Sequence, residues 1–470
     1  MSIETDEQIV VVGAGPAGLA AATALVSYGA NVLLIDAGQR VGGQYWRHSA
    51  GSALSNKHEE MRIISHPNVE YLPDTNVWAA TYLDGISTLH LLMNGAQERK
   101  VITRWLIMAT GAYDRSLPIP GWDLPGVMTT GGVQALLKGE KRLAGKEFVV
   151  AGTGPFLLPV AVGLIMSGAK VNAIVEAAPL SAWLTNFGGL ARSGNKFRDF
   201  ATFQKIIRTA KVKIHYGSAI VAAHGTNSLE SVTLQKIGRD FLVKRRAKIK
   251  KPCDVLAVGW GFTPDISLAS ALGCRTRLES RDGSLVVAVD ENQGTSLVGI
   301  YAAGEATGVG GSALALTEGK IAATAMAQAI GLIEPTKSAK LIQEQKRVHR
   351  KQQIFANALL DVYRVAHGWT TWPTAETIIC RCEEVTVGQL RDAISELGVS
   401  DGRTAKSLTR VGMGMCQARV CGQAVSEFVA KECGRKVTLA DLQGGAKRPI
   451  ITPIPLGLLA NGISDRTIRS

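Results

Sequence analysis

The sequence predicts an α/β protein with two dinucleotide-binding units followed by a small C-terminal domain. Residues 8–36 follow the pattern strand, glycine-rich turn, helix and strand, which is a βαβ unit. Residues 147–176 repeat this pattern. Four cysteines gather between residues 380 and 421. These observations predict two nested Rossmann-like domains plus a cysteine-bearing domain at the C-terminal end.

Length and composition indicate several packed units. The chain has 470 residues, of which 46% are hydrophobic, and this exceeds what one hydrophobic core organises. Lysine and arginine outnumber aspartate and glutamate by 52 − 39 = 13. The basic residues are scattered, apart from short clusters such as Lys244–Lys251, and neither an RNA-binding aromatic motif nor a helix-turn-helix signal accompanies them. We therefore expect no nucleic-acid partner, and interpret the charge as a solvated surface or a dock for an acidic partner.

The N-terminal residues and the cysteine usage favour a cytoplasmic protein. Met1–Gln8 is acidic, whereas a secretory signal is basic. No run of about twenty apolar residues lacks glycine, charge or turn residues, so no transmembrane span is expected, and any membrane link would be peripheral to the inner face. Seven cysteines in a chain of this length are better explained as thiols or metal ligands than as a disulfide framework.

The first glycine-rich turn carries a complete dinucleotide-binding pattern. It lies between a strand, Gln8–Val12, and a helix, Pro16–Tyr28, and the next strand ends at Asp36. In the run Gly13–Gly18, the first glycine permits the tight turn, the second lets backbone amides approach a pyrophosphate, and the third lets the helix meet the sheet. Asp36 would accept ribose hydroxyls and disfavour a 2′-phosphate, so FAD or NAD is favoured over NADP.

The second βαβ unit departs from the pattern at one glycine. It comprises a strand, Glu147–Ala151, the turn Gly152–Pro155, a helix to about Ser167 and a strand ending at Glu176. Leu157 stands where a third glycine or alanine would let the helix pack closely. Glu176 still offers a ribose acceptor, so an adenine nucleotide could bind. A vestigial fold element explains the unit equally well.

Four later stretches complete the expected architecture. Gly299–Glu305 is predicted to be a buried strand entering a glycine-rich turn, and Ala313–Gly331 a long helix of small residues. Lys340–His367 has polar residues at helical spacing and is expected to be a solvated linker helix. Lys447–Leu459 is proline-punctuated and is expected to be a tail over a surface.

Two close pairs of cysteines point to an iron–sulfur site. Cys380 and Cys382 are separated by one residue, and Cys416 and Cys421 by four. A span long enough for a helix, such as Val387–Leu397, lies between the pairs. Each iron of a 2Fe-2S cluster takes two protein sulfurs, so paired thiolates from two loops suit it. Tetrahedral zinc is an alternative, as is a redox disulfide within the second pair.

Few other residues point to chemistry. Cys253, Cys274 and Cys433 lack neighbouring cysteines in the sequence and are interpreted as small hydrophobic residues. His48 is the one histidine near the expected cofactor, and a packing role is the simpler interpretation. The catalytic residues therefore stay unassigned.

From residue 8 to about residue 330 the chain resembles the two-domain flavoproteins of the glutathione-reductase type. The likeness rests on the first turn with Asp36, on Gly42–Gln44, on Ala109–Ala112 and on Tyr301–Glu305, where Glu305 replaces the usual aspartate. It implies FAD, or another adenine nucleotide, at the first turn. The implied cofactor-binding residues are Gly13, Gly15, Pro16, Ala17, Gly18, Asp36, Gly43, Gln44, Thr110, Gly111, Gly304 and Glu305.

The cysteine segment resembles the bacterioferritin-associated-ferredoxin-like (BFD-like) domain, which implies a 2Fe-2S cluster on Cys380, Cys382, Cys416 and Cys421. With the linker helix and the run Gly412–Gly422, nearly the whole chain resembles the large (alpha) subunit of opine oxidases, that is octopine or nopaline dehydrogenases, with relatives in D-hydroxyproline dehydrogenase and hydrogen cyanide synthase. In that run, relatives often carry arginine where this chain has Met415.

This resemblance implies an electron-relay subunit of a hetero-oligomer. In that family a glycine-oxidase-like flavoprotein subunit oxidises the amino-acid or opine substrate, and the large subunit passes electrons to an acceptor, often with a small ferredoxin-like third subunit. The resemblance leaves open whether an FMN also binds at a subunit interface. Two other functions also stay open: a self-contained NAD(P)H-dependent reductase, against which Leu157 counts, and a non-catalytic nucleotide-binding assembly subunit.

The expected domain ranges follow from this organisation. Residues 1–118 and 253–335 form the FAD-type domain, and residues 119–252 the second, NAD-type domain. Residues 336–372 form the linker helix, 373–436 the BFD-like domain, and 437–470 the tail.

Overall fold

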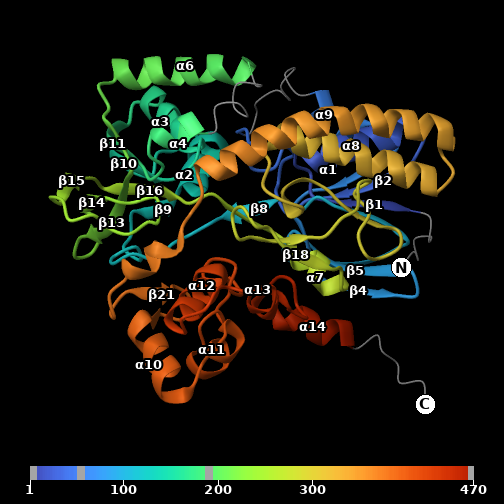
Figure 1. Cartoon of the computed structure of the whole chain (residues 1–470). Helices are drawn as coiled ribbons and strands as arrows, with labels where there is room; N and C mark the ends of the chain where they lie inside the picture. The colour runs from blue at the N-terminus through green and yellow to red at the C-terminus, as the bar shows by residue number, and fades with distance from the viewer. Residues whose placement is uncertain (1–7, 50–58, 186–193, 464–470) are drawn as a thin grey trace.

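The computed structural model describes residues 8–49, 59–185 and 194–463. Residues 1–7, on which the expectation of no secretory signal rests, lie outside these ranges. Figure 1 shows two α/β domains side by side, with the C-terminal domain below both of them and one long helix above. None of the helices within the described ranges is long and apolar enough to cross a membrane.

The first domain is built on a parallel sheet with the order β20-β7-β1-β2-β3. Its strands are β1 (Ile9–Val12), β2 (Val32–Ile35), β3 (Val69–Leu72), β7 (Trp105–Met108) and β20 (Ile300–Ala302). Every residue of β1 and β2 is buried, as expected where helices cover both faces or a second layer packs on the sheet. The βαβ unit expected over residues 8–36 is confirmed, with its helix α1 spanning Pro16–Ser27.

Two layers cover this sheet. Helix α1 packs against α8 (Ser312–Ala329) on one side, and the small residues of both helices allow this close approach. On the other side lies an antiparallel meander, made of β4 (Thr75–Leu83), β5 (Ile86–Met93) and β6 (Gln97–Thr103). Shorter elements are η1 (Glu59–Ser65), α7 (Ser267–Leu272), β18 (Thr276–Leu278), β19 (Leu285–Val287) and η2 (Gly304–Ala306).

The second domain repeats the parallel arrangement with the order β12-β11-β10-β16-β9. These strands are β9 (Val127–Thr129), β10 (Glu147–Gly152), β11 (Lys170–Glu176), β12 (Ile214–Tyr216) and β16 (Val255–Gly259). Its helices are α2 (Thr130–Glu140), α3 (Leu157–Met166), α4 (Ser181–Thr185) and α6 (Gly194–Thr209), and a second antiparallel sheet holds β13 (Ser218–His224), β14 (Ser231–Lys236) and β15 (Ile249–Pro252). Strand β16 belongs to this domain although it lies beyond residue 252.

The chain crosses between the two domains twice at one place. Strands β8 (Ala112–Asp114) and β17 (Phe262–Pro264) pair there in antiparallel fashion. Because both crossings form one ribbon, the two domains share a stiff connection rather than two free linkers.

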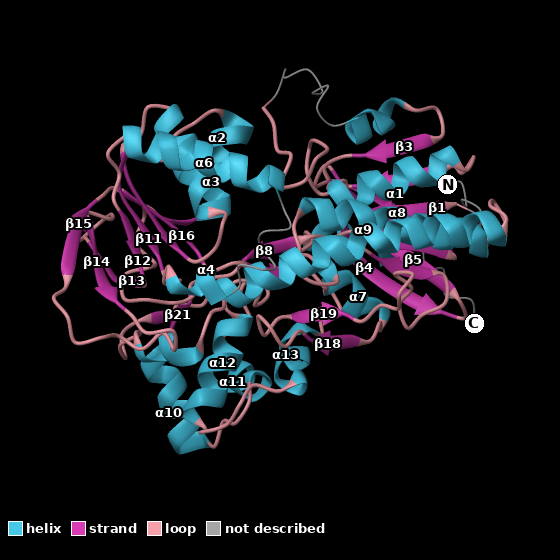
Figure 2. Ribbon diagram, turned by 45° about the horizontal axis from the view of Figure 1, so that its top comes forward, coloured by secondary structure: helices cyan, strands magenta, loops and turns pink. Residues whose placement is uncertain are grey.

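The expected linker helix is α9, Pro335–Val362, followed by the short helix η3, His367–Thr371. Most residues of α9 are exposed or partly exposed, and the helix lies beside α8 (Figure 2). Its C-terminal end reaches the second domain, where Ala358 and Val362 pack against Ala178 and Ala182.

The C-terminal domain is small and mostly helical. It contains β21 (Ile378–Cys380), β22 (Val385–Thr386), α10 (Val387–Leu397), α11 (Gly402–Thr409), α12 (Gly422–Glu432), α13 (Leu439–Ala446) and α14 (Leu456–Ile463). Helix α10 has the expected bounds, because Thr386 and Gln389 form a capping box at its start and Gly398 ends it in the left-handed conformation.

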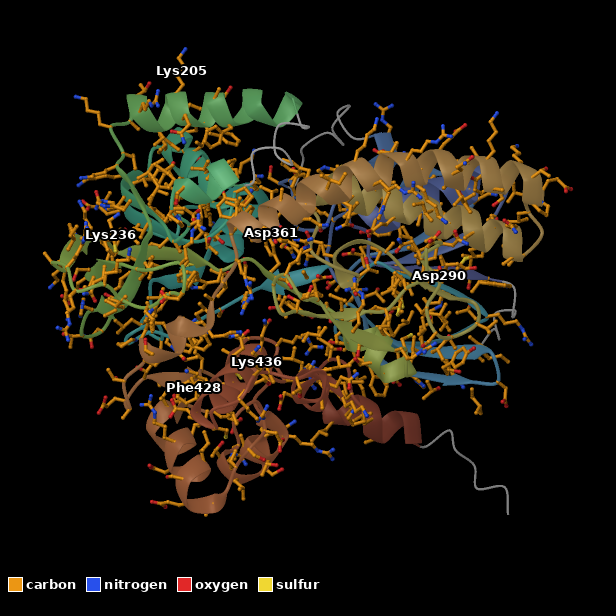
Figure 3. The ribbon with its side chains drawn as sticks, viewed as in Figure 1. Lys205, Lys236, Asp290, Asp361, Phe428 and Lys436 are labelled. Carbon is orange, nitrogen blue, oxygen red and sulfur yellow. The ribbon has the colours of Figure 1, made fainter. Side chains whose placement is uncertain are left out.

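The last segment is more ordered than a surface tail. Leu442 of α13 and Ile451 are buried in the core of the first domain, and the Ile451 amide donates to the Trp78 carbonyl at 2.7 Å. The core of the second domain likewise continues through Trp260 and Trp369 to Phe428 of α12, which is labelled in Figure 3. The C-terminal domain is therefore packed against both α/β domains.

Candidate functional site

A large cavity connects the two glycine-rich turns. Its volume is about 1510 Å³. Every residue that the sequence assigned to the nucleotide cofactor lines this cavity, with the exception of Gly18. Leu157, Glu176 and His48 line it as well. The fold therefore brings segments from residue 13 to residue 305 around one space.

The three glycines of the first turn have different neighbours. Gly13 has φ +107°, and a Cβ there would overlap the Ala109 carbonyl. A Cβ on Gly18 would overlap the Gly13 carbonyl, so this glycine serves the contact between helix and strand. A Cβ on Gly15 would have the Gly43 Cα, at 3.9 Å, as its nearest neighbour. The space beside Gly15 is thus open cavity, which fits the approach of a pyrophosphate.

Asp36 is held at the end of β2 by backbone amides. Its carboxylate accepts hydrogen bonds from the amides of Ala14 and Gly38, the latter at 2.6 Å. Burial raises the pKa of Asp36, while the two amides and the Arg47 guanidinium act to lower it. The carboxylate is positioned as an acceptor for a ribose at the first turn.

The late glycine motif is fixed from behind by a residue that sequence reasoning missed. Glu318 of α8 is buried and accepts from the Gly304 amide at 2.8 Å, and His349 of α9 lies 3.1 Å from its other oxygen. Burial raises the pKa of the neighbouring Glu305 to about 7, although a hydrogen bond from the Gly311 amide lowers it. Glu318 could have been noticed in the sequence, because it is a single glutamate within a helix of small residues.

The crossing ribbon forms the wall between the cavity and the C-terminal domain. The Thr110 hydroxyl donates to the Asp265 carbonyl at 2.6 Å, and the Tyr113 hydroxyl donates to the Asp265 carboxylate at 2.6 Å. Arg419, from the loop between the last two cluster cysteines, donates to the Tyr113 hydroxyl at 2.9 Å. All four side chains line the cavity.

At the second glycine-rich turn, the acid at the end of the strand accepts hydrogen bonds from the turn itself. The buried Glu176 carboxyl accepts from the Thr153 hydroxyl at 2.9 Å, the Gly154 amide at 3.2 Å and the Ala178 amide at 2.9 Å. Burial raises the pKa of Glu176 to about 8 despite these bonds. The amide of the second glycine, which would meet a pyrophosphate, is therefore engaged by the protein itself.

The four cluster cysteines come together in the C-terminal domain. Cys380 ends β21, Cys382 follows in the next loop, Cys416 lies in the loop after α11, and Cys421 caps α12. Cys380 and Cys421 are buried, whereas Cys382 is exposed. The cluster position is thus covered on one side and open on the other.

The sulfurs approach each other as two pairs, each with one cysteine from either motif. A hydrogen bond from the Cys421 thiol, stronger than the opposing effect of burial, lowers the pKa of Cys380 to about 5. Cys382 is paired with Cys416, and burial together with this side-chain contact raises the pKa of Cys382. The Gly412 amide donates to the Cys380 sulfur at 3.4 Å, an outer-shell bond typical of iron–sulfur sites.

This arrangement fits a binuclear cluster better than one zinc ion. Cys380 is paired with Cys421, and Cys382 with Cys416, and two sulfur pairs suit the two irons of a 2Fe-2S cluster. A Cβ on Gly414 would overlap the Cys382 side chain, so this glycine lets the two loops meet. Gln417 and Ala418 both have positive φ, +51° and +63°, a strained turn that is found where function demands it.

A buried ion pair fastens the cluster domain to the first domain. Arg115 lies 2.5 Å from Glu427 of α12, and the two side chains are 5% and 3% exposed. The Trp369 indole donates to the other Glu427 oxygen at 3.0 Å, and Arg115 also donates to the Asp282 carbonyl at 3.0 Å. Nothing in the local sequence pattern marks this pair, because its members are far apart in the chain.

Comparisons with known proteins agree with this geometry. Residues 7–331 match the pyridine nucleotide-disulphide oxidoreductase family, and residues 378–431 match the BFD-like [2Fe-2S] binding domain. An opine oxidase subunit of Agrobacterium tumefaciens (strain Ach5) is 30% identical, over 98% of this chain and 93% of its own. The hydrogen cyanide synthase subunit HcnB of Pseudomonas protegens is 30% identical, over 91% and 92%.

L-proline dehydrogenase from P. horikoshii has a similar fold, with a TM-score of 0.68 and 19% identity over 97% of this chain and 80% of that one. The two matched families bind FAD and a 2Fe-2S cluster, and the open space at Gly15 and the paired cysteine sulfurs fit these cofactors. The chain therefore belongs to the pyridine nucleotide-disulphide oxidoreductase family of flavoproteins, in the group that contains this opine oxidase subunit and HcnB of hydrogen cyanide synthase.

Proposed function

We propose that the chain is the electron-relay subunit of a multi-subunit oxidoreductase that acts on CH–NH donors. A glycine-oxidase-like partner oxidises an amino acid or opine, and this chain passes the electrons between FAD and the 2Fe-2S cluster toward an acceptor. The names of its relatives support this assignment, since the opine oxidase relative, HcnB and the alpha subunit of sarcosine oxidase are each one subunit of a larger enzyme.

The contact between Arg419 and Tyr113 is the observation that carries the proposal. Arg419 lies between two cluster cysteines and, besides Tyr113, it donates to the Cys416 carbonyl at 3.5 Å. Tyr113 lines the cavity next to Thr110 and Gly111. The cluster loop and the wall of the proposed FAD site are therefore in direct contact. When bound, FAD supplies two-electron chemistry and the cluster supplies one-electron transfer.

The proposed residue roles follow from the cavity. The first turn, Asp36, the loop Gly43–Gln44, the crossing at Thr110–Gly111 and the late motif Gly304–Glu305 would hold FAD. Cys380, Cys382, Cys416 and Cys421 would hold the cluster. An FMN at the interface and a small ferredoxin-like subunit belong to the same proposal.

Co-expression with the partner tests this function. We expect the purified chain, fully loaded with FAD and iron, to leave a redox dye unreduced with opines, D-hydroxyproline, proline, sarcosine and glycine. Co-expression with a glycine-oxidase-like subunit should give a stable complex on size exclusion and dye reduction with one of these substrates. Turnover by the single chain would contradict the relay, and flavin reduction by NADH alone would instead identify a reductase.

A further inference from the structure

The half of the cavity next to the second turn has an apolar, aromatic lining. We call this half the second lobe; it is bounded by the second βαβ unit and the end of α9. The aromatic side chains that line it include Phe156, Trp183, Phe200, Tyr216, Phe355 and Tyr363. The arginines that line the whole cavity are Arg40, Arg47, Arg115 and Arg419, and all of them lie outside the second domain. Among the described residues, none that lines the second lobe is an arginine or a lysine, and Arg208 of α6, which acts on the lining residue Tyr216, is itself not part of the lining.

The turn of the second lobe is poorly suited to a pyrophosphate. Helix α1 begins directly after Gly15, at Pro16, but α3 begins only at Leu157, with Phe156 as its N-cap. Leu157 occupies the position of Gly18, whose Cβ would overlap the backbone of the first turn. Because Glu176 accepts from the Gly154 amide and Leu157 replaces the third glycine, the turn offers a weaker anion site than a dinucleotide needs.

Aromatic side chains from the end of α9 and from the second domain pack together beside Glu176. Tyr363, at the C-terminal end of α9, packs edge-on against Trp183 with ring centroids 5.8 Å apart, and Trp183 packs against Phe200 at 5.8 Å. Burial raises the pKa of Tyr363, and the nearby Glu176 acts in the same direction. These side chains form an aromatic wall beside Glu176, a surface on which a planar ring stacks well.

Glu176 is a proton donor at neutral pH in this setting. Burial raises its pKa to about 8, so the carboxyl group holds its proton at pH 7. The titratable groups that face it are Tyr216 from β12 and Tyr363 from α9, and burial raises the pKa of both phenols as well. The group nearest the turn is therefore a neutral acid rather than a carboxylate.

We propose that the second lobe binds a quinone as the electron acceptor, with Glu176 supplying a proton to one of its carbonyl oxygens. A neutral planar ring matches the aromatic wall, and the lobe is continuous with the cavity of the first turn. The quinone takes two electrons and one proton from the reduced anionic flavin and the second proton from Glu176, which gives the hydroquinone and oxidised flavin, and Glu176 then regains its proton from solvent. This proposal rests on the proposed function only for the source of the electrons.

Binding is tested on the FAD-loaded full chain without any partner. We expect menadione and ubiquinone-1 to quench tryptophan emission in a saturable way, and NAD+ and NADH to have no saturable effect. Leu180 lines the lobe and is 59% exposed, so Leu180→Arg should fold and weaken quinone binding about 10-fold by placing a charge in an apolar site. Leu83→Arg, at a site 73% exposed and away from the cavity, is the matched control and should bind quinones like the parent. Saturable NADH binding without quinone binding, or equal quinone binding by both variants, would overturn the proposal.

Proton donation is tested separately by stopped flow. The chain is reduced anaerobically with dithionite and mixed with menadione, so a missing partner subunit cannot affect the result. Flavin reoxidation should slow as pH rises through about 8, and Glu176→Gln should slow it about 10-fold or more at pH 7 and remove the pH dependence. Reoxidation by ferricyanide, which needs no proton, should be the same in parent and variant. A Glu176→Gln chain that keeps the parental rate with menadione would refute the role of Glu176.

Discussion

The two glycine-rich turns of this protein share a backbone and differ in chemistry. In each, the first glycine has positive φ and lies against a carbonyl at the end of the neighbouring strand, Ala109 for Gly13 and Gly259 for Gly152. In each, an acid at the end of the next strand bonds to the turn. The strand–turn–helix frame is therefore the same, and the difference lies in which groups remain available to a ligand.

One residue accounts for much of that difference. Gly18 permits α1 to start against the first turn, whereas Leu157 displaces the start of α3. The longer side chain of Glu176 adds to this difference between the turns. Glu176 accepts from the amide of the second glycine of its turn, whereas Asp36 accepts from the amide that precedes the second glycine of the first turn. The two turns thus share a dinucleotide-binding backbone while different groups remain open to an anion, and fold alone does not establish a ligand.

The largest effect is expected on FAD binding, when the same substitution is made at the second glycine of each turn and the two variants are compared. Gly15→Val should abolish FAD binding, because the side chain would fill the cavity space that a pyrophosphate needs. The measurement is flavin released per folded chain, with the visible bands of the cluster as the marker of folding.

Gly154→Val is the matched control in the second turn. Gly154 has φ +126° with open space around it, so the variant is expected to lose some stability and to keep its FAD. If the folded Gly15→Val chain contained as much flavin as the parent, the proposed FAD site at the first turn would be wrong.

Removing the cluster should leave both turns intact. Cys382→Ser or Cys416→Ser should lose the brown colour and the two irons and two sulfides that a 2Fe-2S cluster brings, while FAD content stays unchanged. Cys274, buried against the first sheet, offers the control, and Cys274→Ser should keep its colour. Stoichiometric zinc without acid-labile sulfide, in protein made with ample iron, would contradict the cluster assignment.

A smaller effect is expected from the two acids. Asp36→Ala should weaken FAD binding about 10- to 100-fold, since a hydrogen bond to a charged group contributes roughly 1.5–3 kcal/mol. Equilibrium titration of the apoprotein with FAD measures this change. Glu176→Gln should leave FAD affinity as in the parent, and a similar loss in both variants would show that the second turn also contacts the cofactor.

The last prediction concerns stability and its dependence on pH. The pKa of Glu176 is raised to about 8 from a reference of 4.5, so between these values the folded chain keeps a proton that the unfolded chain releases. The free energy of unfolding should therefore fall as pH rises from about 4.5 to about 8, by on the order of 1 kcal/mol per pH unit. Urea unfolding at several pH values measures the slope, which should become flatter in Glu176→Gln. An unchanged slope would mean that Glu176 is ionised in the folded chain.

The local elements and their chemistry could be predicted from the amino-acid sequence. Glycine spacing identified the first turn, because a tight turn and a close backbone approach need glycine at set positions, and Leu157 marked the second turn as different. The four cluster cysteines were recognisable for the same reason, since ligand spacing within a loop is a local property. Helix α10 was bounded by its own caps.

The contacts between these parts became visible in the folded chain. Arg115 and Glu427, or Tyr113 and Arg419, are separated by some three hundred residues, and no periodicity in a sequence reports contacts of that range. The pairing of each cysteine with one from the other motif, the placement of Tyr363 beside Glu176 and the burial that keeps Glu176 protonated are of the same kind. Solvation and charge depend on what surrounds a group in space, and the chain surrounds Glu176 with residues from several distant segments.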